Sequence, residues 1–400
     1  MLYDNEDKKE YKHFNKAFLY FLILLMIVTG STNTILNKII QNTKGKKIKF
    51  EQHHWLITFG MFIGELFSIF YYIFIIIRRK KDNPKKNQEE NPKKIPVPTN
   101  FIFSISALCD LFSTTLHTFG LSYLTSSIFQ MLRGFGLFFT CLLSKVILKN
   151  EIYRHQYFGV GTLILGLIII GVNSILIEER QVEAKPAFVG IILLFLGQFF
   201  NAIENIVQKK FVKKYIIHPS QLVGFEGLWG SCIYLILLIV FQNISCDDWV
   251  DKFKKGICFT NDEDISYIEN SKFALEQMWD NKYLLILYMF YVISISLYNL
   301  VGIKLTELVS STARVVVDEA RTVFIWLFFI IFDPVEGTHE EFNYLQLIGY
   351  IFLLFGTIIY NEILVIPICN LDYNTRDKKE ERDIKKAKEE EEKEQLYISI

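Results

Sequence analysis

The sequence has none of the motifs by which enzymes commonly hold a nucleophile, a phosphate or a catalytic metal. It contains no nucleophile elbow, P-loop, HExxH or CxxC pattern. Its 7 histidines are scattered, and the adjacent pair His53 and His54 lies just before an apolar stretch, where a metal site is not expected. We therefore expect no enzymatic activity, no cofactor, no bound metal and no binding of nucleic acid.

Charged residues are rare within the long apolar stretches that occupy most of the chain. Apolar residues make up 51% of the 400 residues, and the charged residues cluster in short blocks. A helix needs about 20 apolar residues to cross a hydrocarbon core roughly 30 Å thick. Ten stretches of that order are present: 16–38, 55–77, 101–121, 125–148, 155–177, 187–208, 219–241, 283–303, 309–332 and 343–366. The first is long enough to span, so we expect a first helix and no cleavable signal peptide. The sequence thus predicts an all-α, multi-pass membrane protein with ten transmembrane helices.

Basic residues indicate which side of the membrane each connection faces. Short loops on the cytosolic side retain Lys and Arg. The connection after the second stretch carries eight of these residues between positions 78 and 94, and the basic blocks at 8–16, 149–154 and 209–214 fall on the same side. Both termini are therefore predicted to be cytosolic, and the acidic loop 242–282 is predicted to face the lumen or the exterior. Its Cys246 and Cys258 either form a disulfide or remain two unpaired thiols, and the sequence leaves both open.

The two halves of the chain resemble each other. The segment "TSSIFQMLRGFGLFFT" from Thr125 pairs with "SSTARVVVDEARTVFI" from Ser310, and Gln156, Gly159 and Gly166 pair with Gln346, Gly349 and Gly356. A weaker match places Asn33 in the first span over Glu204 in the sixth. We expect a cytosolic head (1–15), a first five-helix repeat (16–177), a second (187–366) and a charged cytosolic tail (371–400). Because each half has an odd number of spans, the second repeat is inverted, as in alternating-access transporters.

Several predicted spans carry ionisable residues, which cost free energy in lipid unless they are paired or face water. Arg314, Asp318 and Arg321 lie at i, i+4 and i+7 on one face of the ninth span, with Glu319 pointing about 100° away. Arg133 and Gln130 share a face of the fourth span. Acidic residues of other spans are Glu65, Asp110, Glu204 and Glu226.

Three interpretations of these charges remain open. In one, they are structural ion pairs, and the protein is a non-transporting membrane scaffold. In another, the arginines line a water-filled cavity and bind an anionic substrate. Its lining would be Gln130, Arg133, Arg314, Asp318 and Arg321, with Asn33 and Glu204 as a pseudo-symmetric polar pair. In a third, some of the carboxyl groups bind protons that are coupled to transport. The candidates for a coupling or structural role are Glu65, Asp110, Glu226 and Glu319.

Five segments carry a resemblance to a known family. They are "MIVTGSTNTILNK", "GMFIGELFS", "ALCDLFSTTLHTFGLSYLTSSIFQMLRG", "HPSQLVGFEGLWG" and "STARVVVDEARTVFIW". From about residue 18 to 363 the chain resembles the drug/metabolite transporter (EamA-type) superfamily, and most closely the F subgroup of the solute carrier 35 proteins, relatives of the nucleotide-sugar transporters. The resemblance implies a ten-helix inverted-repeat carrier with a central cavity, in an endomembrane that is often lysosomal. The loop 242–282 and the charged tail depart from this pattern.

The hypothesis from sequence is a secondary carrier of a small, polar, anionic metabolite, with nucleotide sugars or nucleotides as leading candidates. Its expected partners are that substrate and the lipid bilayer. A homodimer is left open. The chain ends in Tyr397-Ile398-Ser399-Ile400, which fits the tyrosine-x-x-bulky pattern that clathrin adaptors bind, although such a short pattern also arises by chance. The expected location is the lysosome, the vacuole or the Golgi.

Overall fold

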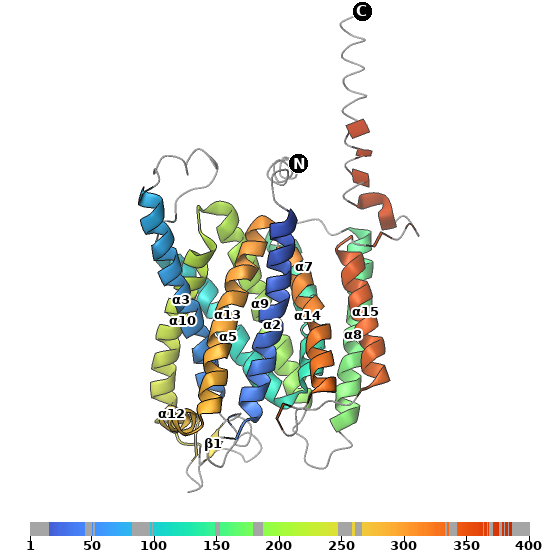
Figure 1. Ribbon diagram of the computed structural model, residues 1–400. Coiled ribbons are helices and arrows are strands. Elements are labelled where there is room, and N and C mark those ends of the chain that lie inside the picture. Colours follow the sequence, from blue (N-terminus) through green and yellow to red (C-terminus); the bar gives the residue numbers. More distant parts are fainter. Residues whose placement is uncertain are drawn as a thin grey trace, which may run out of the picture.

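Long helices that alternate in direction make up the computed structural model of the protein (Figure 1). It describes residues 16–44, 50, 53–81, 97, 99–148, 153–178, 187–246, 258–260, 266–309, 311–332, 334–335, 342–362, 364–365, 367, 371–375, 378–379, 381–382 and 384–385. The long helices are α2 (Lys16–Asn42), α3 (His54–Lys81), α5 (Phe103–Tyr123), α7 (Phe135–Leu148), α8 (Arg154–Glu178), α9 (Ala187–Lys214), α10 (Pro219–Phe241), α13 (Lys282–Leu308), α14 (Ser311–Ile331) and α15 (Tyr344–Tyr360). Shorter elements are η3 (Asn100–Ile102), α6 (Ser126–Leu132), α12 (Ser271–Asp280), η4 (Leu371–Asn374) and the two-residue strands β1 (Phe259–Thr260) and β2 (Ser266–Tyr267).

Each of the ten predicted spans coincides with one helix or with a consecutive pair of helices. Within the described residues, eight spans are long and apolar enough to cross a membrane. The other two are α14, whose 21 residues include the four charges noted above, and α15, whose apolar helix has 17 residues. The prediction of an all-α membrane protein is confirmed.

The fourth span is broken, whereas the sequence predicted one continuous helix over 125–148. α6 ends at Leu132, and α7 begins at Phe135. Between them the backbone forms short i→i+3 bonds, from Gly134 N–H to Met131 C=O (3.1 Å) and from Gly136 N–H to Arg133 C=O (2.8 Å). Two glycines within three residues weaken the α-helix, because glycine loses more backbone entropy on ordering than other residues do. The break therefore falls at Arg133.

Helix packing in one half of the bundle corresponds to packing in the other half. α5 packs on α9 as α13 packs on α2, and α7 packs on α9 as α14 packs on α2. α3 packs on its counterpart α10, and α8 packs on its counterpart α15. In the α8–α15 contact a Cβ at Gly159 would lie 2.8 Å from the Gly356 carbonyl oxygen, and a Cβ at Gly166 would lie 2.5 Å from that of Gly349. Glycine thus permits close helix contact at the paired positions found in the sequence.

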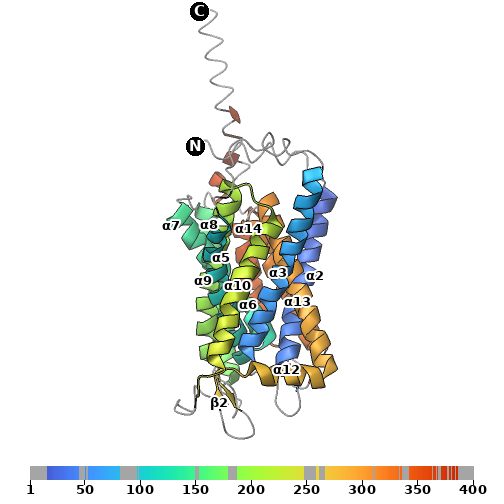
Figure 2. The same ribbon diagram turned by 90° about the vertical axis from the view of Figure 1, so that its left-hand side faces the viewer.

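The end of the bundle opposite the start of α2 and the end of α15 carries a small cap (Figure 1). There β1 and β2 pair in antiparallel register, and α12 lies across the helix ends (Figure 2). The sequence predicted only a long hydrophilic loop at 242–282, so α12 was not foreseen. Cys246 and Cys258 form a disulfide, which decides between the two alternatives left open above.

The tail that follows α15 contains the short turn η4 among its described residues. Lys378 donates a hydrogen bond to the Asp372 carboxylate, and this bond lowers the pKa of Asp372. Lys379 donates to the Tyr153 hydroxyl at 3.2 Å, which places this part of the tail beside the start of α8. The sequence predicted a solvated or disordered tail, and the last candidate motif, 397–400, lies outside the described residues.

Candidate functional site

A polar cavity lies inside the bundle and is lined by seven of its helices together with Arg133 at the α6–α7 break. Its volume is about 100 Å³. The lining includes five of the residues proposed from sequence: Asn33, Arg133, Glu204, Arg314 and Arg321. Asp110, from the proposed set of coupling or structural carboxylates, also lines it. The remaining polar lining comes mainly from Asn37, Thr58, Thr114, His117, Asn201, Tyr298 and Asn299.

Asp318 of α14 joins two of the arginines that line the cavity. Its Oδ2 lies 3.0 Å from Arg133 Nη2, and its Oδ1 lies 3.0 Å from Arg321 Nε. The Tyr298 hydroxyl of α13 donates a hydrogen bond to the same Oδ1. Arg133 and Asp318 are 185 residues apart, and they occupy equivalent positions when the fourth span is aligned with the ninth. One carboxylate therefore pairs with two guanidinium groups, one from each half of the chain.

Glycines leave room for two of the arginines. A Cβ at Gly30 of α2 would lie 2.5 Å from Arg321 Nη1, and a Cβ at Gly302 of α13 would lie 2.7 Å from Arg314 Nε. The Arg321 side chain is only 2% exposed, and its guanidinium carbon lies 4.8 Å from the centre of the Tyr298 ring, in a cation–π contact. Any larger residue at Gly30 would therefore require Arg321 or Tyr298 to move.

Arg314 has a different environment from the other two arginines. Its Nη1 donates to the amide oxygen of Gln208 at 3.0 Å, and within the described residues no carboxylate oxygen lies within 4.0 Å of its nitrogens. The amide nitrogen of Gln208 in turn donates to Glu204 Oε1 (2.7 Å) and to Glu226 Oε1 (3.1 Å). Gln208 thus links the arginine to two buried acids without direct ion pairing.

The other proposed residues lie around this centre. Gln130 is buried, and its Nε2 donates to the Thr34 hydroxyl of α2 at 3.1 Å, so it contacts a lining residue without lining the cavity itself. Glu65 of α3 accepts a hydrogen bond from the Asn299 amide. Glu319 is 4% exposed, and its Oε2 has no hydrogen-bond partner in the described part of the chain. All the proposed charged residues except Glu319 therefore either line the cavity or are linked to a lining residue, directly or through Gln208.

Sequence reasoning missed several residues of the site. Gln208 and Asn299 are amides inside predicted spans, and their polarity could have marked them. His117 also lines the cavity, and its Nε2 accepts from Gln198 Nε2 at 3.0 Å. Tyr298 gave no signal, because tyrosine is common in this sequence, with 20 copies.

In its described residues, the site has no cluster of side chains of the kind that binds a metal ion: no group of three or more His, Cys, Asp or Glu side chains in that part of the chain is placed to hold one. What the geometry provides is a buried, polar chamber with both signs of charge on its walls. Such a chamber can bind a solute that is shielded from lipid.

Comparison with known proteins shows which family the chain resembles. The model of the CRT-like family, described as chloroquine-resistance transporter-like, matches residues 19–360. Solute carrier family 35 member F6 of Homo sapiens is 31% identical over 350 residues, and the match covers 85% of this chain and 88% of that protein. The protein of the same name from Rattus norvegicus is 31% identical over 347 residues, with the same coverage. An uncharacterised protein of Schizosaccharomyces pombe is 25% identical over 358 residues and is matched over 99% of its length.

The resemblance found in the sequence is thus confirmed at the level of the family, which is one of solute transporters and not of enzymes. The chain belongs to the CRT-like family of membrane transporters, within the drug/metabolite transporter superfamily.

Proposed function

We propose that the protein carries a small polar metabolite with an anionic group across an endomembrane by alternating access. The observation that carries this proposal is Arg314. It lines the cavity, and its hydrogen bond goes to a neutral amide, whereas Arg133 and Arg321 share Asp318. A guanidinium that has no carboxylate partner among the described residues can form charge-assisted hydrogen bonds with a carboxylate or phosphate of the substrate.

Cavity size constrains the substrate. Sites for ligands of drug size commonly enclose about 300–1,000 Å³, whereas this cavity has about 100 Å³. A nucleotide or nucleotide sugar, the class suggested by the resemblance, would therefore bind only after the helices separate. The proposal assigns the present conformation to a closed state of the transport cycle.

The two-repeat organisation supports the proposed mechanism. Corresponding helix pairs pack in the same way in the two halves, and the fourth span is broken beside the cavity. Broken helices and inverted repeats at the binding site are common in secondary transporters. We propose residues 16–177 and 187–366 as the two units that rock against each other. The scaffold alternative is less favoured because the family is one of transporters.

Transport by the purified full-length protein in proteoliposomes tests the proposal. Labelled nucleotide sugars, nucleotides, sugar phosphates and dicarboxylates would be compared with neutral analogues, in wild type and in Arg314→Gln. Losing a charge-assisted hydrogen bond costs about 1.5–3 kcal/mol, so uptake of the anionic substrate at low concentration should fall by roughly 10- to 150-fold.

The matched control is Lys304→Gln, which removes a positive charge from the neighbouring helix α13 at a site where the side chain is 34% exposed. We expect this control to transport as wild type does. Equal uptake by Arg314→Gln and wild type, or uptake of neutral analogues alone, would contradict the proposal.

Proton coupling is a second candidate function, and the balance of charges favours it. The three arginines of the site share the cavity and its immediate surroundings with five carboxyl groups, namely Glu65, Asp110, Glu204, Glu226 and Asp318. Because isolated buried charges are costly, we propose that some of these carboxyl groups bind protons. Glu204→Gln should abolish the response of transport to an imposed pH gradient, while exchange without a gradient persists. Wild-type transport that ignores the gradient would rule the coupling out.

We also propose an endomembrane location, with the lysosome, vacuole or Golgi as the candidates and both termini in the cytosol. The basic connections support this orientation, and the Cys246–Cys258 disulfide fits an oxidising lumen at the opposite end. A tag at the C-terminus should be digested by protease added to intact organelles, and a protected tag would refute this orientation. Adaptor binding through Tyr397–Ile400 and homodimer formation remain proposals.

A further inference from the structure

α12 is an amphipathic helix with three distinct faces. Ala274, Gln277 and Met278 are buried against the rest of the protein. Leu275 and Trp279, one helical turn apart, are 59% and 79% exposed. A water-facing loop has no need to expose a tryptophan and a leucine side by side, so this second face requires a partner.

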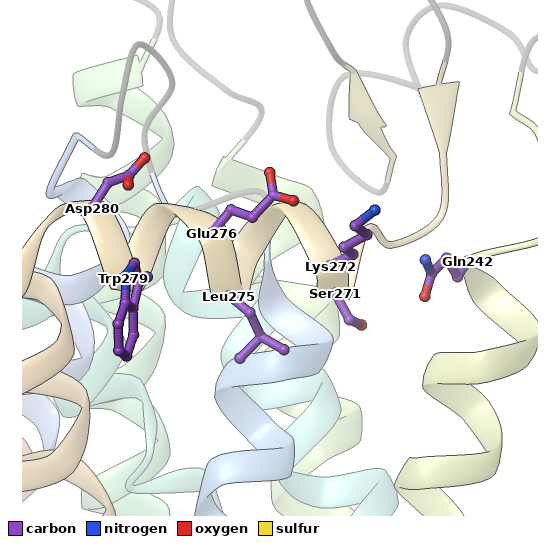
Figure 3. Close-up of a pocket in the computed structure, with 7 residues that line it drawn as sticks. All are labelled: Gln242, Ser271, Lys272, Leu275, Glu276, Trp279 and Asp280. Atoms are coloured by element: carbon purple, nitrogen blue, oxygen red, sulfur yellow. The ribbon is translucent and has the colours of Figure 1, made fainter.

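The remaining face of α12 is polar and consists of Lys272, Glu276 and Asp280. Figure 3 shows Leu275 and Trp279 pointing toward the side from which the membrane helices extend, while Glu276 and Asp280 point to the opposite side. The apolar face is therefore directed toward the long helices of the bundle, and the polar face is directed away from them.

The orientation of α12 is fixed by its junction with α13. Asn281 is the only residue between the two helices, and it serves both. Its N–H donates to the Gln277 carbonyl at 3.0 Å, and its Oδ1 accepts from the N–H groups of Tyr283 (3.1 Å) and Leu284 (3.3 Å). Its side-chain amide donates to the Lys44 carbonyl at 3.2 Å. The apolar face of α12 consequently cannot rotate toward the protein core.

Exposed apolar side chains also lie on the spans that adjoin α12. The nearest turns of α10 expose Ile239 and Val240, and the first turns of α13 expose Tyr283 and Ile286. A groove of about 560 Å³ runs along α12 to Gln242 at the end of α10, and Leu275 and Trp279 form part of its wall. The groove thus lies where the apolar surface of the bundle ends.

We infer that α12 is an interfacial helix docked in the bilayer leaflet at this end of the protein, with Leu275 and Trp279 inserted among phospholipid chains. Helices that lie in a membrane interface bury their apolar face about 5–10 Å into the boundary between headgroups and acyl chains. Tryptophan is enriched at this depth, because its ring is apolar and its N–H remains near water. The groove beside α12 is then occupied by phospholipid. Since the polar face carries one basic and two acidic residues, the docking depends on apolar contact and needs no anionic lipid.

Fluorescence quenching of the full-length protein in nanodiscs of zwitterionic phosphatidylcholine tests the inference. The lipids would carry bromine near the glycerol end of the acyl chains, near their methyl end, or not at all. We expect wild type to show a component that is quenched most by bromine near the glycerol end and that acrylamide in the water does not reach. Trp279→Phe should lose this component, which assigns it to α12 against the background of the other tryptophans.

The matched control moves the indole to the polar face by combining Glu276→Trp with Trp279→Phe. Its new tryptophan should be quenched by acrylamide and not by bromolipid. Size-exclusion profiles identical to wild type establish that both variants are folded. Quenching of Trp279 by acrylamide would overturn the inference in favour of a water-exposed helix. Protection of Trp279 from both quenchers would overturn it in favour of cover by a second copy or another protein.

Discussion

Replacing Asp318 by asparagine should destabilise the protein more than any other change of a single charge to an amide in the bundle. The substitution keeps the shape of the side chain and removes the charge that Arg133 and Arg321 share. Asparagine can still accept one hydrogen bond, but its amide nitrogen would face a guanidinium donor. Arg321 is 2% exposed and Arg133 17% exposed, so water cannot readily replace the lost partner.

The magnitude follows from the burial of these charges. Removing one partner of a buried ion pair costs about 3–5 kcal/mol, because an uncompensated charge remains. At about 2 °C per kcal/mol for a large domain, the melting temperature should fall by about 6–10 °C. The measurement is thermal unfolding of the purified protein in detergent, followed by intrinsic fluorescence. The expected fall belongs mainly to Arg321, which is the more deeply buried of the two.

The control for this prediction is Glu307→Gln, the same chemical change in the ion pair between Lys304 and Glu307. That pair has a nitrogen–oxygen distance of 2.7 Å but is 34% and 27% exposed, so its loss should cost at most about 1 kcal/mol. If Asp318→Asn unfolds at the same temperature as this control, the two arginines do not depend on Asp318, and the argument from buried charge fails.

Three further variants probe the site and the cap. Gly30→Ala should cost about 1–3 kcal/mol, because the new Cβ would lie 2.5 Å from Arg321 Nη1, whereas Gly161→Ala, with open space around it, should leave the melting temperature equal or slightly higher. Exchanging the charges of Arg133 and Asp318 in one double variant should fail to restore stability, because an arginine at 318 would face Arg321; restored stability would show an isolated pair. Cys246→Ser should cost about 2–4 kcal/mol, and a reducing agent should lower the melting temperature of wild type but not of this variant.

The apolar pattern predicted the ten spans because the membrane requires a continuous apolar helix of a fixed length. The break in the fourth span was not predicted, although the glycines that cause it are visible in the sequence. A glycine within a span indicates close packing as often as a break, and the difference depends on its neighbours in space. Here a Cβ at Gly134 would lie 2.9 Å from a methyl group of Leu353 on α15, a contact that no local pattern contains.

The candidate site was predicted in part. Helical spacing placed Arg314, Asp318 and Arg321 on one face, and the ion pair between Asp318 and Arg321 follows directly from that spacing. The link from Arg314 to Gln208 was not predictable, because it depends on how α9 packs beside α14. α12 escaped notice for a different reason: half of its ten residues are polar, and its exposed apolar face consists of only two side chains.

The position of the Arg133–Asp318 pair bears on how the two halves would move. The residues are equivalent positions of the fourth and ninth spans, so a direct contact between them lies on the axis that relates the proposed repeats. The two glycine contacts between α8 and α15 also respect this axis. Gly159 corresponds to Gly349, and Gly166 corresponds to Gly356, so exchanging the two halves converts the Gly159–Gly356 contact into the Gly166–Gly349 contact. If the halves exchange conformations during transport, contacts on the axis persist while contacts away from it change partners. The ion pair between Arg133 and Asp318 would then connect the two halves in every state of the transport cycle. The contact of Asp318 with Arg321 has no such equivalent in the first half, because Gly136 occupies the position that corresponds to Arg321. It would form and break between states, and Arg321 is therefore better suited to a conformational role than to binding substrate in every state.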